Sequence, residues 1–313
     1  MTTINTKAKT CEQLLVKFHA APRNTKVEKL TFSGVGNRDV YNITAPFICD
    51  GEEVIVGRVE ERDSEFSQVF FFTRINQVWS PRVHTHTYNL QDPCVTSIKG
   101  ELIFGGVEII TAAEDPNVIV SWVTQFYRGL HIDALCHFSS GPGTMKDIRL
   151  IELSDGRIGI FTRPQGVRGG RGQIGFTIIQ SLEELDEQTF SNADILQDQF
   201  VVEEWGGANE AHLLKNGHVG VLGHIACFDD QLNKHYYSMV FSINPETCEK
   251  TPIKIIAARS DFPDGPGKRP DLTDVIFSGG LVRLDNGRAV LSVGVSDAEA
   301  YRIEIPDPFI EYE

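Results

Sequence analysis

The sequence has no long apolar run and a deficit of cationic side chains. No stretch of about 18 apolar residues occurs, and Met1–Lys9 lacks the apolar centre of a signal peptide. Lys and Arg number 29 against 43 Asp and Glu, giving a net charge of −14. This balance argues against a broad surface for nucleic acid or anionic membrane. We therefore expect a cytoplasmic protein without nucleic-acid or membrane partners, and the oligomeric state stays open.

Paired cysteine motifs are also missing. None of the six cysteines forms a C-x-x-C pair, and their density is too low for a disulfide-stapled secreted scaffold. These six residues are Cys11, Cys49, Cys94, Cys136, Cys227 and Cys248. We expect them to be free thiols. The G-x-S-x-G and H-E-x-x-H motifs are absent as well, so nothing supports a serine hydrolase or a zinc protease.

Two motifs that are present lack the context they need. Gly170–Gly175 matches G-x-G-x-x-G, but a β-like run follows where a helix would have to receive a pyrophosphate. His84 and His86 could face one side of a strand, yet no third ligand is indicated nearby, which favours exposed loop histidines. We therefore expect no metal and no organic cofactor.

Helical periodicity is scarce, and short β-rich runs bounded by Gly, Pro, Asn and Asp recur along the chain. Residues 9–19 predict one short amphipathic helix capped by Thr10, and Ser181–Leu185 predicts a single turn. The rest of the chain is predicted to be strand and turn.

Five segments repeat one design, in which a turn glycine opens an apolar strand that ends in polar residues. The glycines are Gly51, Gly100, Gly156, Gly217 and Gly287, at intervals of 49, 56, 61 and 70 residues. Such spacing, with several short strands per repeat, is typical of propeller blades lengthened by loop insertions. A β-sandwich would have similar hairpins, but it does not explain why all five strands end in polar groups. The pattern predicts an all-β, five-bladed β-propeller whose strand ends converge on one pocket.

Four polar stretches carry the chemistry, namely Arg58–Asp63, Gln91–Pro93, Lys146–Arg149 and Phe161–Pro164. Each alone is explained by a turn or a surface ion pair. Together they place carboxylates and cations at matching ends of repeated strands. That arrangement suits the hydroxyl groups of a sugar with an anion beside it.

These residues resemble those of glycosyltransferase family 108, once listed as domain of unknown function 1861. This family of mannosyltransferases and phosphorylases is related to the β-mannoside phosphorylases of glycoside hydrolase family 130. The matching runs are Tyr41–Phe47, Arg58–Glu60, Gln91–Pro93, Gly141–Asp147, Asp155–Gln165, His224 and Gly294–Asp297. They span nearly the whole chain, so the resemblance implies one propeller domain over residues 1–313.

The resemblance implies inverting transfer of a β-linked mannosyl unit, most simply β-1,2-linked, between an oligosaccharide and inorganic phosphate, which is the co-substrate. The family's acid lies in a Glu-Asp-Pro-Arg run, so Asp92 is the implied general acid, acting through a sugar hydroxyl. Gln91 and Cys94 depart from that run, so we expect the contacts around Asp92 to differ from those of the family.

Phosphate is already a competent nucleophile, so one carboxylate suffices and cationic or imidazole groups must hold the anion. The candidates for this role are Arg58, Lys146, Arg163 and His224. The candidates for holding mannose hydroxyls are Asn42, Glu60, Asp147 and Asp297. Each of these last four has an alternative role in a turn or in closing a blade.

Two alternatives remain. The first is mannosyl transfer from GDP-mannose, with Arg168–Arg171 meeting the diphosphate, although this loop is equally explained as a solvated insertion. The second is a non-catalytic glycan-binding propeller, against which Asp92 and Lys146 both argue.

Overall fold

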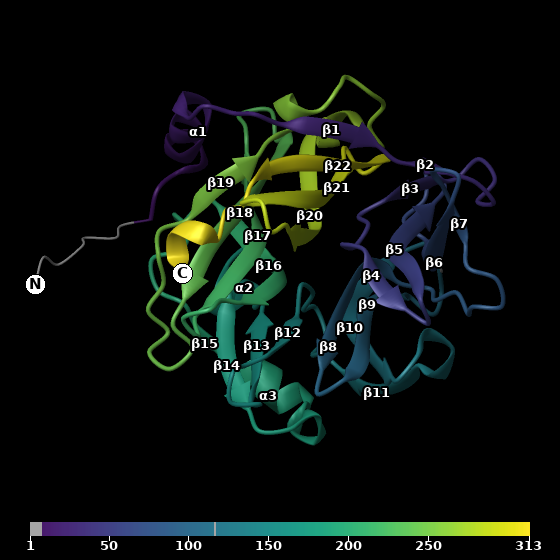
Figure 1. Ribbon diagram of the computed structural model, residues 1–313, viewed down its shortest axis with the longest axis horizontal. Helices are drawn as coiled ribbons and strands as arrows, with labels where there is room; N and C mark the ends of the chain where they lie inside the picture. The colour runs from purple at the N-terminus through teal and green to yellow at the C-terminus, as the bar shows by residue number, and fades with distance from the viewer. Residues whose placement is uncertain (1–7, 116) are drawn as a thin grey trace, which may run out of the picture.

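Strands dominate the computed structural model, which describes residues 8–115 and 117–313. The expectation of an all-β protein is confirmed. The strands form antiparallel meanders, and Figure 1 shows these arranged around a common centre. None of the helices in the described residues has the length and hydrophobicity needed to cross a bilayer.

The first two strand groups are separate sheets. In the first, β5 pairs with β3, β4 and β6, and β7 continues from β6 to the short parallel strand β2. Its bounds are β2 (Thr31–Phe32), β3 (Asp39–Tyr41), β4 (Phe47–Cys49), β5 (Glu52–Glu60), β6 (Ser67–Ile75) and β7 (Val78–Pro81). The second is a four-stranded meander of β8 (Gln91–Ile98), β9 (Glu101–Thr111), β10 (Ile119–Gly129) and β11 (Cys136–Ser140).

Three further groups follow. The third contains β12 (Arg149–Glu152), β13 (Ile158–Thr162), β14 (Gly175–Ile179) and β15 (Asp194–Ile195). The fourth contains β16 (Trp205–Leu213), β17 (Val219–Phe228), β18 (Lys234–Ile243) and β19 (Lys254–Ala257). The fifth contains β20 (Asp274–Arg283), β21 (Arg288–Val295) and β22 (Glu299–Pro306), with β1 (Lys26–Lys29) pairing along β22. A short parallel pairing of β18 with β20 joins the fourth and fifth groups.

The five predicted glycines occupy corresponding turns. Each lies in the turn before β5, β9, β13, β17 or β21, with at most one residue between the glycine and the strand, and each has φ between +77° and +82°. Glycine adopts this left-handed conformation without steric cost, which explains its recurrence there. Whether the five turns are related by rotation about one axis stays a prediction.

The N-terminal helix is confirmed as α1 (Cys11–Ala20), with Thr10 accepting from the backbone of Gln13 in a capping box. The predicted turn is also present, as a 3₁₀ helix capped by Ser181. The remaining helical elements are short: α2 (Gly166–Gly169), α3 (Glu187–Asn192), η1 (Ile132–Ala134), η2 (Leu182–Glu184), η3 (Arg259–Asp261), η4 (Pro270–Leu272) and η5 (Ile310–Tyr312).

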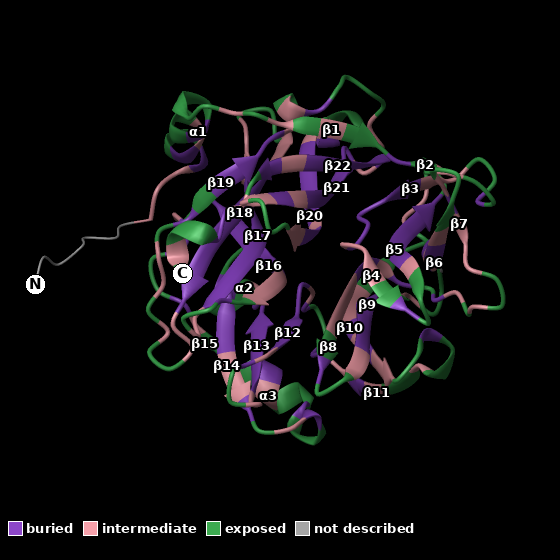
Figure 2. Cartoon of the chain, viewed as in Figure 1, coloured by how far each residue is buried: buried purple, intermediate pink, exposed green. Residues whose placement is uncertain are grey.

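The hydrophobic core of the described residues lies between neighbouring strand groups. Five clusters occur, represented by Phe71 with Phe104, Phe126 with Ile160, Phe176 with Val221, Val240 with Ile276, and Trp79 with Ala300. The first four join consecutive groups, and the last joins the fifth group to the first. In Figure 2 the strand interiors are mostly buried, and exposed residues concentrate in loops and along the outer side of α1.

Candidate active site

A polar cavity of about 190 Å³ gathers residues from all five strand groups. Eight of the nine predicted site residues line it: Asn42, Arg58, Asp92, Lys146, Asp147, Arg163, His224 and Asp297. A larger apolar cavity of about 530 Å³ lies between α1, β19 and the C-terminal segment, and contains none of the predicted residues. The chemistry that the sequence predicts therefore converges on the smaller cavity.

Four of the cavity residues have a left-handed backbone. The φ angles are +46° at Asn42, +47° at Asp92, +58° at Asp147 and +50° at Asp297. Few residues other than glycine adopt this conformation, although Asn and Asp tolerate it best. At Asp92 the backbone conformation accompanies a register shift between Gln91 and Cys94. In a regular strand, side chains alternate between the two faces of the sheet. The bends at these four residues interrupt that alternation, and their short polar side chains line the cavity.

Asp92 is buried and tied to the first strand group. Its Oδ1 accepts hydrogen bonds from Asn42 Nδ2 at 2.7 Å and from Arg58 Nη1 at 3.2 Å. Burial is the largest influence on the Asp92 pKa and raises it, but the charges of Arg58 and Lys146 and these hydrogen bonds outweigh burial. The pKa of Asp92 is thereby lowered to about 2. In the free protein Asp92 is a carboxylate at neutral pH.

Glu60 does not line the cavity. Its carboxylate accepts from Arg58 Nε at 2.9 Å and from Arg58 Nη2 at 2.5 Å, and it also pairs with Lys268. Both Glu60 oxygens are thus engaged by cations, and the guanidinium is held between Glu60 and Asp92. The structure therefore places Glu60 against Arg58, outside the set that faces the cavity.

Asp147 and Arg163 form a second buried ion pair, with Asp147 Oδ2 at 3.2 Å from Arg163 Nη1. Arg163 Nε also donates to the Gly206 carbonyl at 2.8 Å. Burial raises the pKa of Asp147, but Arg163 and the neighbouring His224 and Lys146 lower it overall. Its Oδ1 is buried without a hydrogen-bond partner among the described residues and lies 3.9 Å from Arg149 Nη2.

His224 is buried and neutral. Burial lowers its pKa to about 3, with Arg163 and Lys146 acting in the same direction against the carboxylate of Asp147. The Nδ1 atom lies 2.9 Å from Asn209 Oδ1, and the ring stacks on Tyr236 at 5.3 Å. His224 therefore brings hydrogen-bonding capacity, and no charge, to the cavity.

The cations of the cavity differ in how far they are already paired. Arg58 and Arg163 form ion pairs with carboxylates. The Lys146 side chain is half-buried and makes no hydrogen bond or ion pair with the described residues. Lys146 is thus the cation most available to a bound anion.

The pKa of Asp297 is shifted in the opposite direction to that of Asp92. It lies in the turn between β21 and β22 and has no hydrogen-bond or ion-pair partner among the described residues. Withdrawal from water raises its pKa, and the charges of Asp92 and Glu60 add to this effect, while Arg58 and Lys268 oppose it. The cavity therefore holds two carboxyl groups whose environments separate their pKa values.

Sequence reasoning missed four polar residues that also line the cavity, namely Glu65, Lys234, Tyr236 and Arg269. Glu65 accepts from Arg269 Nη1 at 2.8 Å and lies 3.1 Å from Lys268 Nζ, so loops of the first and fifth groups meet beside the cavity. The basic residues of the Gly/Pro-rich segment 263–271 were the available signal.

The structure also locates Gln91 and Cys94, which depart from the family run, and the glycine motif. Gln91, where the family run has Glu, donates to the Glu65 carbonyl at 2.8 Å. Cys94, where the run has Arg, is packed against Gly105. The glycine motif ending at Gly175 leads into β14 (Gly175–Ile179), the strand that the sequence predicts after it.

Comparison with known proteins gives one family and several solved structures. The sequence model described as "Protein of unknown function (DUF1861)" matches residues 17–311. No curated protein sequence matches the chain.

Two similar structures come from Leishmania mexicana. MPT-4, a mannose phosphorylase in complex with phosphate ion, is 38% identical with a TM-score of 0.88, over 95% of this chain and 93% of that one. MPT-1, a GDP-Man-dependent mannosyltransferase, is 34% identical with a TM-score of 0.88, over 96% of each chain.

A β-1,2-mannobiose phosphorylase from Listeria innocua, in complex with β-1,2-mannobiose, is 11% identical. Its TM-score is 0.59 over 93% of this chain and 94% of that one, a likeness of fold alone.

Proposed function

The chain belongs to the DUF1861 family, and from its cavity we propose that it is an inverting β-mannoside phosphorylase. The substrates are inorganic phosphate and an oligomannoside, taken to be β-1,2-linked. One observation carries the proposal: a carboxylate, Asp92, and an unpaired cation, Lys146, face one cavity in a chain 38% identical to a mannose phosphorylase that binds phosphate.

We also propose that the five strand groups are the blades of a five-bladed propeller around this cavity. The corresponding glycine turns and the five core clusters between successive groups support that architecture. In such a ring, residues at matching strand ends point to one centre without long connecting loops.

In the proposed reaction, phosphate attacks the anomeric carbon and the bond to the leaving glycosidic oxygen breaks, with inversion. The leaving oxygen takes a proton, which Asp92 delivers through a hydroxyl of the bound sugar. Phosphate at Lys146 would offset part of the cationic field that keeps the Asp92 pKa low, so the acid form becomes more accessible once the anion is bound. Arg58, Arg163 and His224 complete the proposed anion site, and Asn42, Asp147 and Asp297 the proposed hydroxyl contacts.

Mannosyl transfer from GDP-mannose is the second candidate, because MPT-1 is 34% identical over 96% of the chain. In the proposed diphosphate loop, Arg168 is occupied by the Ala193 carbonyl, while the exposed Arg171 stacks over Phe228 at 4.9 Å. The cavity of about 190 Å³ is smaller than the roughly 300 Å³ at which pockets for drug-sized ligands begin. A mannosyl unit with phosphate beside it fits that size better than a mannosyl unit with a nucleoside diphosphate.

The test is to incubate the pure protein with β-1,2-mannobiose and phosphate and to assay mannose 1-phosphate. A parallel incubation uses GDP-mannose with mannose as acceptor. Phosphate-dependent mannose 1-phosphate supports the phosphorylase, and GDP release with a mannoside product supports the transferase. Oligomannoside binding without either product would leave the glycan-binding propeller as the better account.

A further inference from the structure

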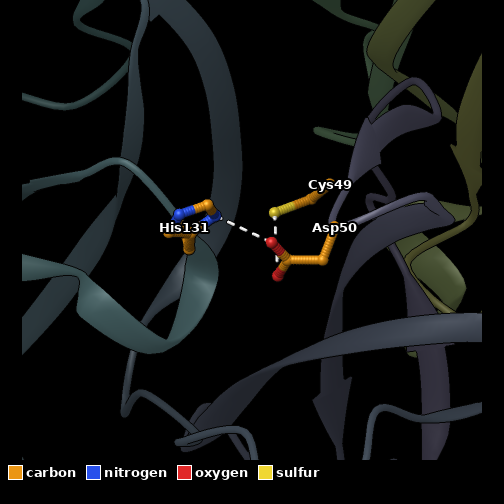
Figure 3. A group of neighbouring side chains, drawn as sticks. All are labelled: Cys49, Asp50 and His131. Atoms are coloured by element: carbon orange, nitrogen blue, oxygen red, sulfur yellow. Dashed lines mark hydrogen bonds and ion pairs between the residues drawn. The ribbon is translucent and has the colours of Figure 1, made fainter.

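A second cluster of reactive side chains lies outside the cavity, between the first and second strand groups. Cys49 ends β4, Asp50 follows it in the turn before β5, and His131 stands between β10 and η1. Figure 3 shows the three side chains pointing toward one another from these two segments. Each offers a ligand atom, and the three atoms all lie within 4.8 Å of one another.

The Asp50 carboxylate joins the other two side chains of the cluster. His131 Nδ1 lies 2.7 Å from Asp50 Oδ1, and the Cys49 thiol lies 3.6 Å from Asp50 Oδ2. Atoms bound to one Zn²⁺ at about 2.0–2.3 Å are at most about 4.6 Å apart. Small side-chain movements would therefore bring all three donors to a shared ion. Cys49 is buried, whereas Asp50 and His131 are exposed, so an ion could enter from solvent.

The surrounding charge favours a divalent cation. Arg82 pairs with three carboxylates at once, at 3.2 Å from Asp50, 2.9 Å from Glu52 and 2.9 Å from Asp133. One guanidinium thus faces three negative charges, which leaves two in excess. The sulfur and imidazole donors suit Zn²⁺, whereas Mg²⁺ and Ca²⁺ prefer oxygen ligands throughout.

We propose that Cys49, Asp50 and His131 form a zinc site that links the first and second strand groups. The three side chains supply one thiolate, one carboxylate and one imidazole, and water takes the fourth position. Binding releases the Cys49 thiol proton to solvent, and the imidazole keeps its single proton on the nitrogen that does not bind the metal. The thiolate and the carboxylate together balance the charge of the ion. The site is separate from the proposed reaction, so neither proposal depends on the other.

The test is titration of the purified, chelator-treated protein with Zn²⁺ by calorimetry. We expect one ion per chain and a higher melting temperature with zinc. Loss of an outer-shell partner already lowers metal affinity about 10- to 100-fold, so Cys49→Ala and His131→Ala should each weaken binding by at least about a hundredfold. Cys248→Ala and His19→Ala, which change a cysteine and a histidine elsewhere, should bind as the wild type does.

Co²⁺ supplies a second readout, because thiolate bound to Co²⁺ gives a charge-transfer absorption that carboxylate and imidazole do not. That absorption should appear in the wild type and vanish in Cys49→Ala. Circular dichroism verifies folding, and the exposed His131 provides a variant that does not disturb the core. The absence of stoichiometric binding would refute the site, as would unchanged zinc affinity in a folded Cys49→Ala or His131→Ala protein.

Discussion

At the scale of single residues, the main prediction concerns Asp92 as the general acid of the proposed reaction. Asp92→Asn keeps the side-chain shape and removes the ionisable group, so we expect turnover of β-mannosides to fall at least about a hundredfold. Oligosaccharide binding and the fold should be nearly unchanged. Steady-state assays of mannose 1-phosphate, with calorimetry for binding, measure both quantities.

Asp297→Asn is the matched control, since Asp297 lines the same cavity and has the raised pKa. As a hydroxyl-binding residue it should affect the KM for mannoside more than kcat. If Asp297→Asn abolished turnover while Asp92→Asn kept close to the wild-type rate, the proton would have to come from Asp297.

Lys146 should act on phosphate alone. Because a hydrogen bond to a charged group contributes about 1.5–3 kcal/mol, Lys146→Ala should raise the KM for phosphate by roughly ten- to a hundredfold. The KM for mannoside should change little, and Lys146→Arg should restore part of the phosphate affinity. Unchanged phosphate dependence in Lys146→Ala would contradict the assignment.

At the scale of elements, α1 stabilises the fold, and none of its residues lines the polar cavity that contains Asp92. Cys11, Leu14 and Phe18 on its buried face join the core cluster shared with β17 and β19. Leu14→Ala should lower the free energy of unfolding by about 2–5 kcal/mol, as other buried leucines do. Val16→Ala on the exposed face is the control, and urea denaturation is the measurement. Specific activity well below the melting temperature should be equal in both variants.

The turn glycines allow a second comparison at this scale. Gly100 has φ of +81°, and a Cβ added there would have no neighbouring atom within 4 Å, so Gly100→Ala introduces backbone strain without a clash. The expected loss of stability is about 1–2 kcal/mol. Gly143 has only the Ser121 hydroxyl near an added Cβ, at 3.7 Å, and no left-handed backbone, so Gly143→Ala should be nearly neutral. Equal unfolding free energies for the two variants would speak against strain at the repeated turn.

At the scale of the whole molecule, buried His224 ties stability to pH. Its pKa in the fold, about 3, lies below the ordinary value of 6.5, so between these values the unfolded chain binds a proton that the folded protein does not. The stability contributed by this group is full above pH 6.5 and is lost as the pH falls toward 3. The slope from one such group is at most about 1.4 kcal/mol per pH unit.

Chemical denaturation at several pH values between 4 and 7 tests this dependence. His224→Gln should flatten the acid-side decline, and the exposed His19→Gln should leave it as in the wild type. An unchanged decline in folded His224→Gln would show that other groups cause it.

The same scale shows how far a sequence can predict such a molecule. The turn at Gly51 and its four counterparts can be recognised in the sequence because turn chemistry is local, and their spacing predicts the all-β fold and strand ends that converge on one pocket. The places of Asp92 and Lys146 in that pocket were predicted from the family resemblance. The contacts of Glu60 could not be predicted from the sequence, because Lys268, one of its partners, lies 208 residues away in the chain. The same holds for Cys49 and His131, whose proximity depends on how two strand groups pack.

The left-handed backbone at Asn42, Asp92, Asp147 and Asp297 also limits which substitutions the cavity can accept during evolution. Asp and Asn tolerate that conformation, and β-branched or bulky apolar residues do not. A single-nucleotide change interconverts Asp and Asn codons. Lineages with this scaffold can therefore lose or regain an acid without disturbing the chain around it, while drift toward an apolar pocket is obstructed. Catalytic and purely glycan-binding descendants of such a protein should differ by few acid-to-amide exchanges at these four positions.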